Sequence, residues 1–575
     1  EASTTDTQDP KDHPVDSEDN HIQTTQETSV NEVPEKEALF PTDVADRIFF
    51  IDLANKQLQT ISPEVLCLKH LEELHMEKNL IVSIPREINR LRNMKVLYLN
   101  QNHIQDICEE LGEMKSILSL DLSNNPLSYS SLPVISNLQS LRKLRLYKIN
   151  LQEVPVQICK YLHHIELLGL SDNNLQCLPK EIVNLKNLKE IYLRNNRFEK
   201  FPIELCRIAN LEVIDLEQNR ISLISAQVGS LTNLVKLFLA FNNLSSVPPT
   251  LQRCQKLAVL DVSHNLLHKL PPGLKNLTEM REVRLSGNSL EKFPQQIRCW
   301  TSLSHVYLRN TGLCKVPRSF TGLTSVRVLD LSENSFNEIP KGICSMKTLE
   351  ILTLDGNQIQ EIPAEIQELT NLKCLGLSEN RFSVFPMEIF LLESLEKLYL
   401  GQDKGVKFTS LPEDITKLQN LKELHLQNNC LEYLPPDIGL LTHLKILDCH
   451  NNLLKELPES VCQIQGLQKL LLQNNQLSRL PEDLDALQKL REVLVDGNPM
   501  TDPPIEVCSQ GTSAILEYLK EKKRKKAVTS KVGLWHDLMI KKGIGTFLTF
   551  KNIANKKKEK RKSKQKPGKE AKGKK

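Results

Sequence analysis

Residues 188–198 read Leu-Lys-Glu-Ile-Tyr-Leu-Arg-Asn-Asn-Arg-Phe, and this stretch decides the fold. Ile191 and Leu193 alternate with Tyr192 and Arg194, which is the pattern of a short strand with one buried face. Apolar residues follow the strand at intervals that suit a coil closing over the same interior. The stretch therefore predicts one strand and one return segment. The other apolar residues of this unit are Leu188, Phe198, Phe201 and Leu205.

The same pattern, L-x-L-x-x-N-x-L, occurs twenty times along the chain. Successive units are 23 residues apart, except for two steps of 24 and one of 26. Such a period is typical of a solenoid, because one unit alone cannot bury its apolar face and must stack on its neighbours. The sixth position of the pattern falls at residues 56, 79, 102, 125, 149, 173, 196, 219, 242, 265, 288, 311, 334, 357, 380, 403, 429, 452, 475 and 498.

The sixth position is Asn in sixteen of the twenty units. An Asn side chain both donates and accepts hydrogen bonds, so it can satisfy backbone groups where the chain turns away from the strand. The exceptions are Lys56, Ile149, Thr311 and Asp403. Because Ile149 can form no such bond, we predict a locally irregular coil beside it.

This pattern, with a proline at the bend of many units, resembles the intracellular leucine-rich repeat family of the L-P-x-x-I type over residues 46–505. The resemblance implies an α/β solenoid: a horseshoe of about twenty 23-residue repeats with a parallel sheet on its concave face. Residues 506–526 resemble the helix that closes such solenoids. The prolines are Pro85, Pro155, Pro202, Pro340 and Pro458.

The two ends of the chain carry opposite charge. Residues 1–46 contain 13 acidic and 2 basic residues, whereas residues 520–575 contain 22 basic and 4 acidic ones. We expect residues 1–45 to form an acidic disordered segment and residues 527–575 to form a basic tail. Contact between the two ends is possible, but two solvated tails are the simpler expectation.

Two stretches interrupt the regular units. Residues 401–410 carry the extra length of the 26-residue step and should bulge from the rim of the solenoid. Residues 127–133, rich in Ser around Tyr129, form a smaller irregularity. Each interruption is either a binding loop or a tolerated surface bulge.

The residue between the two strand hydrophobes should face the concave side in every unit. Tyr, Phe and Arg are enriched at interaction surfaces, so those types at exposed concave positions are candidate binding residues. A solvated surface without a partner is the alternative. The candidates between the strand hydrophobes are Tyr98, Arg145, Tyr192, Phe238, Tyr307 and Tyr399, and the candidates two positions later are Arg194 and Arg309.

The tail contains a second candidate site, within residues 532–547. Apolar residues mixed with Lys suggest a basic amphipathic helix that could bind an acidic partner through Trp535, Lys541 and Lys542. Two glycines in this stretch favour a solvated linker instead. Similarity to family members that carry an IQ motif after the cap places that motif at residues 531–545, but no register fits, so the segment is a degenerate IQ sequence.

The sequence lacks the motifs of an enzyme. It contains no phosphate-binding glycine loop and no paired-Cys zinc spacing, so we predict a non-catalytic protein without a cofactor or metal. The fourteen Cys residues are scattered, which suggests small buried hydrophobes in a reducing, intracellular and cytoplasmic setting. Cys449 lies at a buried strand position. No apolar run is long enough to span a membrane, and no signal peptide is recognisable.

Three functions remain open. The first is a scaffold or adaptor that binds a protein partner on the concave face. The second, suggested by similar L-P-x-x-I solenoids, is regulation of a small GTPase or a phosphatase. The third gives the basic tail the main role, in binding calmodulin or a polyanion, although nucleic acid is the less favoured partner.

Overall fold

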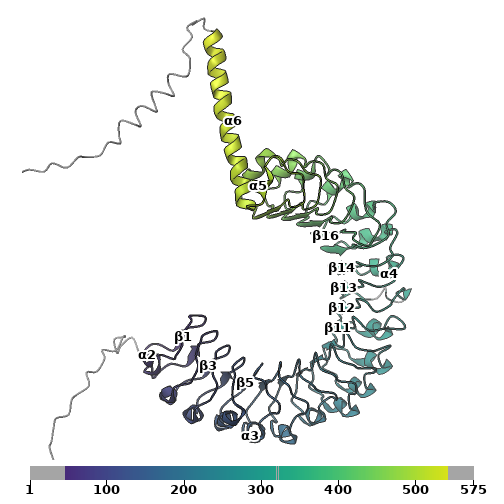
Figure 1. The fold of residues 1–575 in the computed structure, drawn as a ribbon. Helices are drawn as coiled ribbons and strands as arrows, with labels where there is room; N and C mark the ends of the chain where they lie inside the picture. Colours follow the sequence, from purple (N-terminus) through teal and green to yellow (C-terminus); the bar gives the residue numbers. More distant parts are fainter. Residues whose placement is uncertain (1–45, 319, 321–322, 542–575) are drawn as a thin grey trace, which may run out of the picture.

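The computed structural model describes residues 46–318, 320 and 323–541, with every side chain in these ranges except that of Ile540. The predicted acidic segment at residues 1–45 and the tail beyond residue 541 lie outside the described residues. Within the described chain, the repeats form one continuous arc with strands on the inner side and short helices on the outer side (Figure 1). The predicted solenoid is confirmed.

The twenty strands are each three residues long. The strands are β1 (Phe50–Asp52), β2 (Glu73–His75), β3 (Val96–Tyr98), β4 (Ser119–Asp121), β5 (Lys143–Arg145), β6 (Leu167–Gly169), β7 (Glu190–Tyr192), β8 (Val213–Asp215), β9 (Lys236–Phe238), β10 (Val259–Asp261), β11 (Glu282–Arg284), β12 (His305–Tyr307), β13 (Val328–Asp330), β14 (Ile351–Thr353), β15 (Cys374–Gly376), β16 (Lys397–Tyr399), β17 (Glu423–His425), β18 (Ile446–Asp448), β19 (Lys469–Leu471) and β20 (Glu492–Leu494).

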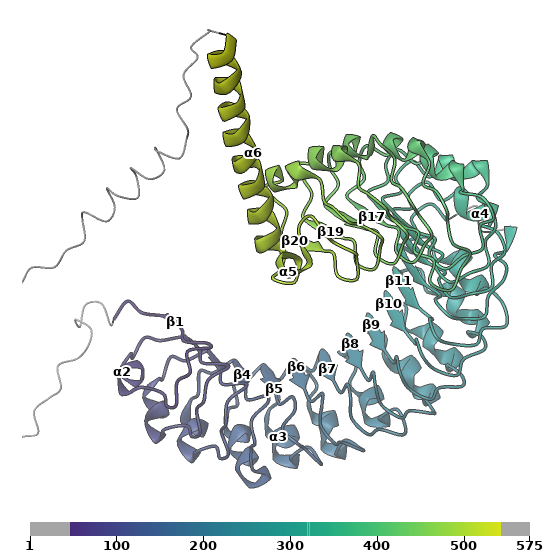
Figure 2. The same ribbon diagram turned by 45° about the horizontal axis from the view of Figure 1, so that its top comes forward.

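Each strand pairs in parallel with the next strand along the chain, and the third residues of all twenty strands lie opposite one another. A three-residue strand is too short to be stable alone, so each one depends on both neighbours. The unbroken register makes the inner side of the arc one sheet (Figure 2).

Short helices complete the repeats, and most begin directly after a proline, whose fixed φ suits a helix start. The helices on the outer side are α2 (Pro63–Leu66), η1 (Arg86–Arg90), η2 (Glu109–Glu113), η3 (Tyr129–Asn137), α3 (Val156–Tyr161), η4 (Lys180–Asn184), η5 (Ile203–Arg207), η6 (Ala226–Ser230), η7 (Pro249–Arg253), η8 (Pro272–Asn276), η9 (Gln295–Cys299), α4 (Lys341–Cys344), η11 (Ala364–Glu368), η12 (Met387–Leu391), η13 (Glu413–Lys417), η14 (Ile438–Leu440), η15 (Glu459–Gln463) and η16 (Glu482–Ala486), where η denotes a 3₁₀ helix.

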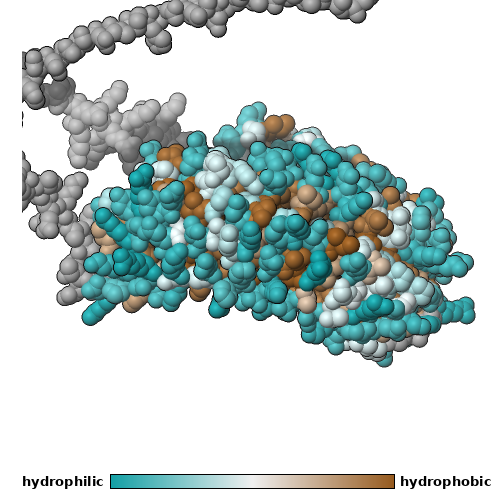
Figure 3. Space-filling model, turned by 90° about the horizontal axis from the view of Figure 1, so that it is seen from below, coloured by the Kyte–Doolittle hydropathy of each residue, from teal (hydrophilic) through white to brown (hydrophobic). Residues whose placement is uncertain are grey.

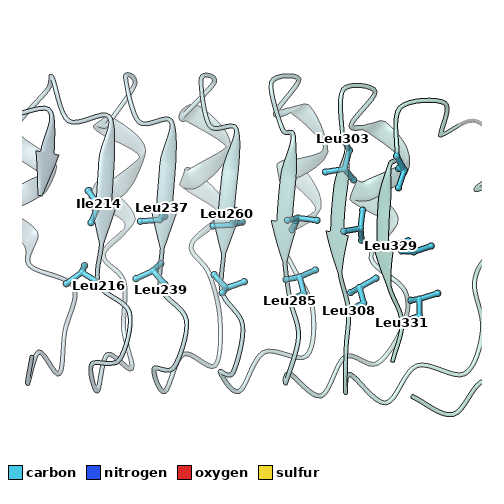
Figure 4. Close-up of a cluster of buried hydrophobic side chains, with 14 of the residues drawn as sticks. Ile214, Leu216, Leu237, Leu239, Leu260, Leu285, Leu303, Leu308, Leu329 and Leu331 are labelled. Carbon is cyan, nitrogen blue, oxygen red and sulfur yellow. The ribbon is translucent and has the colours of Figure 1, made fainter. Parts of the chain in front are cut away.

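The interior consists of repeated rows of aliphatic side chains. Figure 4 shows two such rows, one through Ile214, Leu237 and Leu260 and one through Leu216 and Leu239. All of these side chains are buried, as are the six apolar residues predicted for the unit beginning at Leu188. At about 1.5–3 kcal/mol for each buried large side chain, this core provides most of the driving force for stacking.

The Asn at the sixth position of the pattern makes the same hydrogen bonds in successive units. The Asn196 side-chain amide donates to the carbonyl oxygens of Leu170 and Leu193, both at 3.0 Å, and its Oδ1 accepts from the Leu175 N–H at 3.0 Å. Each such Asn therefore joins its own unit to the preceding one. The same contacts recur along the arc and form a ladder of buried amides.

The units without Asn at this position differ in how their backbone groups are hydrogen-bonded. Thr311 donates its hydroxyl to the Leu308 carbonyl at 2.9 Å. In the 26-residue unit the predicted Asp403 is exposed, and the buried side chain is Gln402, whose Oε1 accepts from the Asn380 N–H at 3.0 Å. Beside Ile149 the sheet stays in register, and the Ile149 and Leu151 N–H groups donate to Asn173 at 3.1 and 3.0 Å, so the coil itself is regular and the prediction of an irregular one is wrong. The nine-residue helix η3 overlaps the other predicted irregularity, at residues 127–133.

The insertion at residues 401–410 bulges from the rim only in part. Val406 is exposed, but Phe408 is buried and packs against Phe382 and Phe385, with ring centroids 6.2 and 5.0 Å apart. The extra residues thus carry an aromatic ring into the core, which holds the loop against the solenoid.

Two helices close the last repeat: α5 (Ile505–Cys508) and α6 (Thr512–Lys541). Ile515 and Leu519 of α6 are buried against the final coil. Helix α6 continues past the predicted end of the cap at residue 526 and projects away from the solenoid (Figure 1). It runs unbroken through Gly533.

The cysteines are all unpaired thiols. Cys449 is fully buried, as predicted, and burial raises its pKa. The prediction of buried cysteines holds for six of the fourteen; four others are half-buried, and four are exposed, namely Cys67, Cys177, Cys299 and Cys314. In the part of the chain that is described, every helix is too short or too polar to traverse a lipid bilayer.

Candidate partner-binding surface

The concave face is built from three columns of side chains. The first and third residues of each strand provide two of them, and the second residue after each strand provides the third. We call the third strand residues the central column and those after the strand the lateral column. The predicted candidates Tyr98, Arg145, Tyr192, Phe238, Tyr307 and Tyr399 lie in the central column, and Arg194 and Arg309 lie in the lateral column.

These candidates do not form one site. Neighbouring strands are about 4.8 Å apart, so Tyr98 on β3 and Tyr399 on β16 are separated by roughly 60 Å along the sheet. Seven of the eight candidates fall instead into four local groups with different neighbours, and Phe238, on β9, belongs to none of these groups. Figure 3, a view from below, shows mainly hydrophilic residues with scattered hydrophobic ones on the outside of the arc.

The densest group is the Tyr–Arg cluster, which we define as Arg145, Tyr147, Tyr192 and Arg194. Tyr147 belongs to the lateral column, and its ring lies directly over Gly169: a Cβ atom there would be 2.4 Å from the Tyr147 Cζ. Glycine on β6 thus leaves space for this ring between Arg145 and Tyr192. Burial raises the pKa of Tyr147 to about 12, so its hydroxyl stays protonated and can donate a hydrogen bond.

Arg194 remains partly available at the edge of this cluster. Its guanidinium lies 3.2 Å from the Glu217 carboxylate, and 47% of its side-chain surface is exposed. Its Nε also contacts the Gln218 Oε1 at 3.5 Å. One carboxylate thus orients the guanidinium while much of its surface faces solvent, which suits bidentate contact with a partner.

Glu217 lies near two other carboxylates and one guanidinium, those of Asp215, Asp261 and Arg194. Burial and the nearby charges of Asp215 and Asp261 together raise its pKa to about 7, against the opposing effect of Arg194. Burial also raises the pKa of Asp215. Negative charge next to the Tyr–Arg cluster is therefore only partly compensated in the free protein.

We expect Glu217→Gln to stabilise the protein in a pH-dependent way. Because the folded-state pKa of about 7 lies above the ordinary value, the stability associated with protonated Glu217 is lost as the pH rises through 7. After a discount for solvent exposure, the variant should be more stable than the wild type by about 1 kcal/mol at pH 8 and nearly equal to it at pH 5. Thermal unfolding midpoints at both pH values measure this difference.

The control for that measurement is Glu212→Gln, at an exposed carboxylate in the same repeat. The control should show the same difference from wild type at both pH values. Glu217→Gln could instead change the unfolding midpoint equally at pH 5 and pH 8. That result would contradict the proposed charge repulsion at Glu217.

A second group surrounds Tyr307 and Arg309. The Arg284 guanidinium lies over the Tyr307 ring at 4.7 Å from its centroid, and Arg309 bonds to Glu333 at 2.5 Å. Cation–π contact and ion pairing hold both arginines in place. Each arginine of this group is paired with one carboxylate, Arg284 with Glu282 and Arg309 with Glu333.

The third group contains Tyr399 and two histidines. The His425 ring stacks on Tyr399 at 4.5 Å, and its Nε2 lies 3.3 Å from Glu423. Asp448 bonds to His450 at 2.6 Å and lies 3.7 Å from His425. Burial alone would lower the pKa of His425, but the hydrogen bonds with Asp448 and Glu423 outweigh it and raise the pKa.

The fourth group, at the amino-terminal end, joins Tyr98 to His75 and Phe50. The His75 ring is 4.7 Å from the Tyr98 ring and 5.2 Å from the Phe50 ring. Phe50 is half exposed on the first strand, although it was not among the predicted candidates.

Sequence reasoning missed Tyr147 and Glu217. It considered the central column and named only arginines in the lateral one. The signal that could have found Tyr147 is Gly169, because a glycine in a column of large residues indicates that a neighbouring side chain occupies its place.

The tail candidates lie on the projecting part of α6. Trp535 is 73% exposed, and Lys541 is exposed at the helix end, whereas Lys542 lies outside the described residues. Val528, Val532 and Met539 are also exposed and lie on the same side of the helix as Trp535. The predicted helix is thus present as far as the structure describes it, but Leu534 and Leu538 are also exposed and lie off this side, so the apolar residues are not confined to one face.

Residues 46–318, 320 and 323–541 contain no group of three or more His, Cys, Asp or Glu side chains arranged to hold a metal ion. The chemistry of the concave face is that of hydrogen bonding, charge and aromatic contact.

Comparison with known sequences identifies the repeats. Residues 319–427 and 406–502 match the family described as leucine-rich repeat region, and residues 139–198 match the family described as leucine rich repeat. Over 154 residues, or 27% of this chain, the sequence is 56% identical to leucine-rich repeat and IQ domain-containing protein 4 of Mus musculus and 54% identical to that of Homo sapiens. These matches span 26% and 28% of those relatives.

Solved leucine-rich repeat structures resemble most of the chain in fold. A leucine-rich repeat protein of Leptospira interrogans has a TM-score of 0.51 at 27% identity, covering 81% of this chain and 94% of that one. The plant peptide hormone receptor RGFR1, in complex with RGF2, has a TM-score of 0.53 at 28% identity, covering 77% of each chain. The single sheet and these matches show that the chain from β1 to β20 is a leucine-rich repeat solenoid.

Proposed function

We propose that the chain is a non-catalytic, intracellular scaffold or adaptor that binds a protein partner on the concave face of its solenoid. The observation that carries this proposal is the Tyr–Arg cluster on an unbroken sheet, with a half-exposed Arg194 beside partly compensated carboxylates. Tyr and Arg dominate binding energy at protein interfaces because they combine large contact area with directed polar groups.

The sheet supplies the rigidity that such a surface needs. Strands β5 to β9 place Arg145, Tyr192 and Phe238 in one register, so little conformational entropy is lost when a partner binds. The receptor RGFR1, similar in fold, is named as a complex with RGF2. By resemblance to L-P-x-x-I solenoids, a small GTPase or a phosphatase subunit are the partner classes to examine first.

The double variant Tyr192→Ala/Arg194→Ala should lose partner binding about 30-fold or more, as expected for two hot-spot residues worth about 2 kcal/mol together. The measurement is quantitative mass spectrometry of proteins retained by the immobilised full chain from cell extract. Both side chains are partly exposed, so folding should be little affected.

Tyr433→Ala provides the matched control, because Tyr433 is 52% exposed and lies far along the chain from the cluster. Partners bound at the concave face should be retained by this control and lost by the double variant. Equal retention by the double variant and the wild type would exclude the cluster as the binding site.

A second candidate function rests on the projecting part of α6. Val528, Val532, Trp535 and Met539 form an apolar stripe on a Lys-rich helix, which suits the groove of an acidic partner such as calmodulin. The degenerate IQ segment predicted at residues 531–545 falls partly on this helix.

Trp535 allows a direct test of that candidate. The chain has two tryptophans, and Trp300 is buried whereas Trp535 is exposed. If calmodulin covers the stripe, its addition should shift the Trp535 emission to shorter wavelength, and moderate salt should not reverse the shift. Binding to a polyanion would instead weaken steeply with salt. No shift with calmodulin, or a shift that persists in Trp535→Ala, would exclude calmodulin binding through this stripe.

A further inference from the structure

The repeat that contains β5 carries four positive charges without a negative partner. Between residues 142 and 148 the chain has four basic residues and no acidic one. Strand β5 itself lies on the inner side of the arc, between β4 and β6 (Figure 2). Among the residues that the structure describes, none of these four side chains forms an ion pair or donates a hydrogen bond. We call them the β5 stripe: Arg142, Lys143, Arg145 and Lys148.

Several other basic residues of the sheet are paired with a carboxylate of a neighbouring repeat. Lys95 lies 2.9 Å from Glu72, and Arg194 lies 3.2 Å from Glu217. Such pairs neutralise a cation within the solenoid and leave it less free to attract a partner. The β5 stripe lacks this neutralisation, so its charge is available to a ligand.

The strands beside β5 explain why its cations are unpaired. On β6, Leu167 lies opposite Lys143 and Gly169 lies opposite Arg145, so this strand provides no carboxylate at either position. On β4, the residue opposite Lys143 is Ser119, which is uncharged. Only one of the four directly opposed positions therefore carries an acid.

That acid is Asp121, opposite Arg145 on β4. Its Oδ1 accepts a hydrogen bond from the Ser123 N–H at 3.0 Å, and the carboxylate lies beyond ion-pair distance of the guanidinium. Burial raises the pKa of Asp121 despite the opposing charge of Arg145. Arg145 is thus half-buried without a direct partner, which is unfavourable for a charged group and would be relieved by an incoming carboxylate.

Two tyrosine hydroxyls provide further donors near Arg145. The Tyr147 ring lies over Gly169, and Tyr192 is on the next strand, β7. Burial raises the pKa of both hydroxyls, so both stay protonated. Neither hydroxyl forms a hydrogen bond with another residue in the described ranges. One guanidinium and two hydroxyls suit a carboxylate, whose two oxygens accept about four hydrogen bonds.

We infer that the β5 stripe and the Tyr–Arg cluster bind an acidic, extended segment of a partner protein. This inference rests on the concave-face binding proposed above and states the chemistry of the partner. Lys143 and Arg145 are two residues apart on one strand, so their side chains leave the same face about 6.6 Å apart. An extended segment with Asp or Glu at alternate positions has the same spacing and places one carboxylate on each cation.

The surroundings favour one acidic peptide chain over a broad polyanion. Asp121 on β4, Glu190 on β7 and Asp215 on β8 place negative charge on both sides of the stripe. A nucleic acid or a lipid surface would meet these carboxylates, whereas a single chain aligned with β5 avoids them. From Arg142 to Lys148 the stripe is about 20 Å long, which accommodates about six extended residues.

The test selects a displayed library of random dodecapeptides on the immobilised full chain and discards those that also bind the Lys143→Gln/Arg145→Gln chain. This step removes peptides that bind the basic tail, because the tail is the same in both chains. We expect the remaining peptides to carry Asp or Glu at alternate positions and to bind the double variant about tenfold or more weakly than the wild type. Lys143 is exposed and Arg145 half-buried, and both are unpaired in the described chain, so the thermal midpoint should not change.

Lys236→Gln/Arg281→Gln is the matched control, because it removes two exposed cations that also lack an ion pair among the described residues. The remaining peptides should bind this control within about twofold of the wild type. If no peptide remained after the discarding step, or if those that remained lacked acidic residues, the inference would be overturned. The concave-face proposal would still stand or fall on Tyr192→Ala/Arg194→Ala, which measures partner retention whatever the charge of the partner.

The acidic residues 1–45 of the chain itself are the alternative occupant. Zero-length carbodiimide coupling of the wild-type chain, without any partner, joins lysines to carboxylates that touch them. We expect no product that links Lys143 or Lys148 to residues 1–45. Such a product within one molecule would overturn the inference, since the chain's own segment would then occupy the stripe.

Discussion

Trp300→Ala should destabilise the centre of the solenoid by about 3–5 kcal/mol, because it removes a fully buried ring and one of the two hydrogen bonds to the Leu274 carbonyl. The Trp300 Nε1 donates to that carbonyl at 2.8 Å, across to the preceding repeat. Since each coil depends on its neighbours, the damage should open the arc locally before the ends unfold. Limited proteolysis should then cut the variant near residue 300 and release two resistant halves.

The second tryptophan gives the control for this experiment. Trp535→Ala removes the same side chain from an exposed helix face, so its thermal midpoint and proteolytic pattern should match those of the wild type. If the Trp300→Ala variant resisted proteolysis and kept the wild-type thermal midpoint, the stability of each coil would not depend on its neighbours as described.

Asn219→Ala should cost about 3 kcal/mol or more. The Asn219 amide donates to the Leu193 and Leu216 carbonyls, both at 3.0 Å, and its Oδ1 accepts from the Phe198 N–H at 3.1 Å. Alanine leaves the buried Phe198 N–H without an acceptor, at about 1–3 kcal/mol. It also removes one of two amide donors from each carbonyl, at about 1 kcal/mol each, since Leu193 keeps Asn196 and Leu216 keeps Asn242. Urea unfolding followed by circular dichroism measures the loss.

Asn210→Ala tests whether burial causes this effect. Asn210 is exposed and makes one bond to the Lys186 carbonyl at 2.8 Å, so its loss should cost under about 1 kcal/mol. If both variants were destabilised equally, the ladder of buried amides would not be the main link between units.

Much of the fold could be predicted because one short pattern repeats. The alternation around Tyr192 and the spacing of the Asn positions determine which residues are buried, and the structure agrees for every position of the worked unit. Features that occur in a single unit were harder to predict. The buried amide of the longest unit is Gln402, not a residue at the aligned position 403, because the insertion shifts the backbone there.

The candidate site was only partly predictable, for a physical reason. The repeat shows which positions face the concave side, and the eight concave candidates lie in the predicted columns. Which of them cooperate depends on side-chain size in adjacent units, as with Tyr147 over Gly169. The length of α6 was not predicted, because the helix continues through Gly533 although glycine has a low helix propensity.

Site-specific photo-cross-linking tests the central claim most directly. A benzoylphenylalanine residue placed at position 192 samples the concave face, and one placed at position 161 samples the outer face, where Tyr161 is 49% exposed on α3. We expect position 192 to capture a distinct protein in living cells and position 161 to capture none. Capture from position 161 with nothing captured from position 192 would show that partners bind the outer face, and would contradict the account.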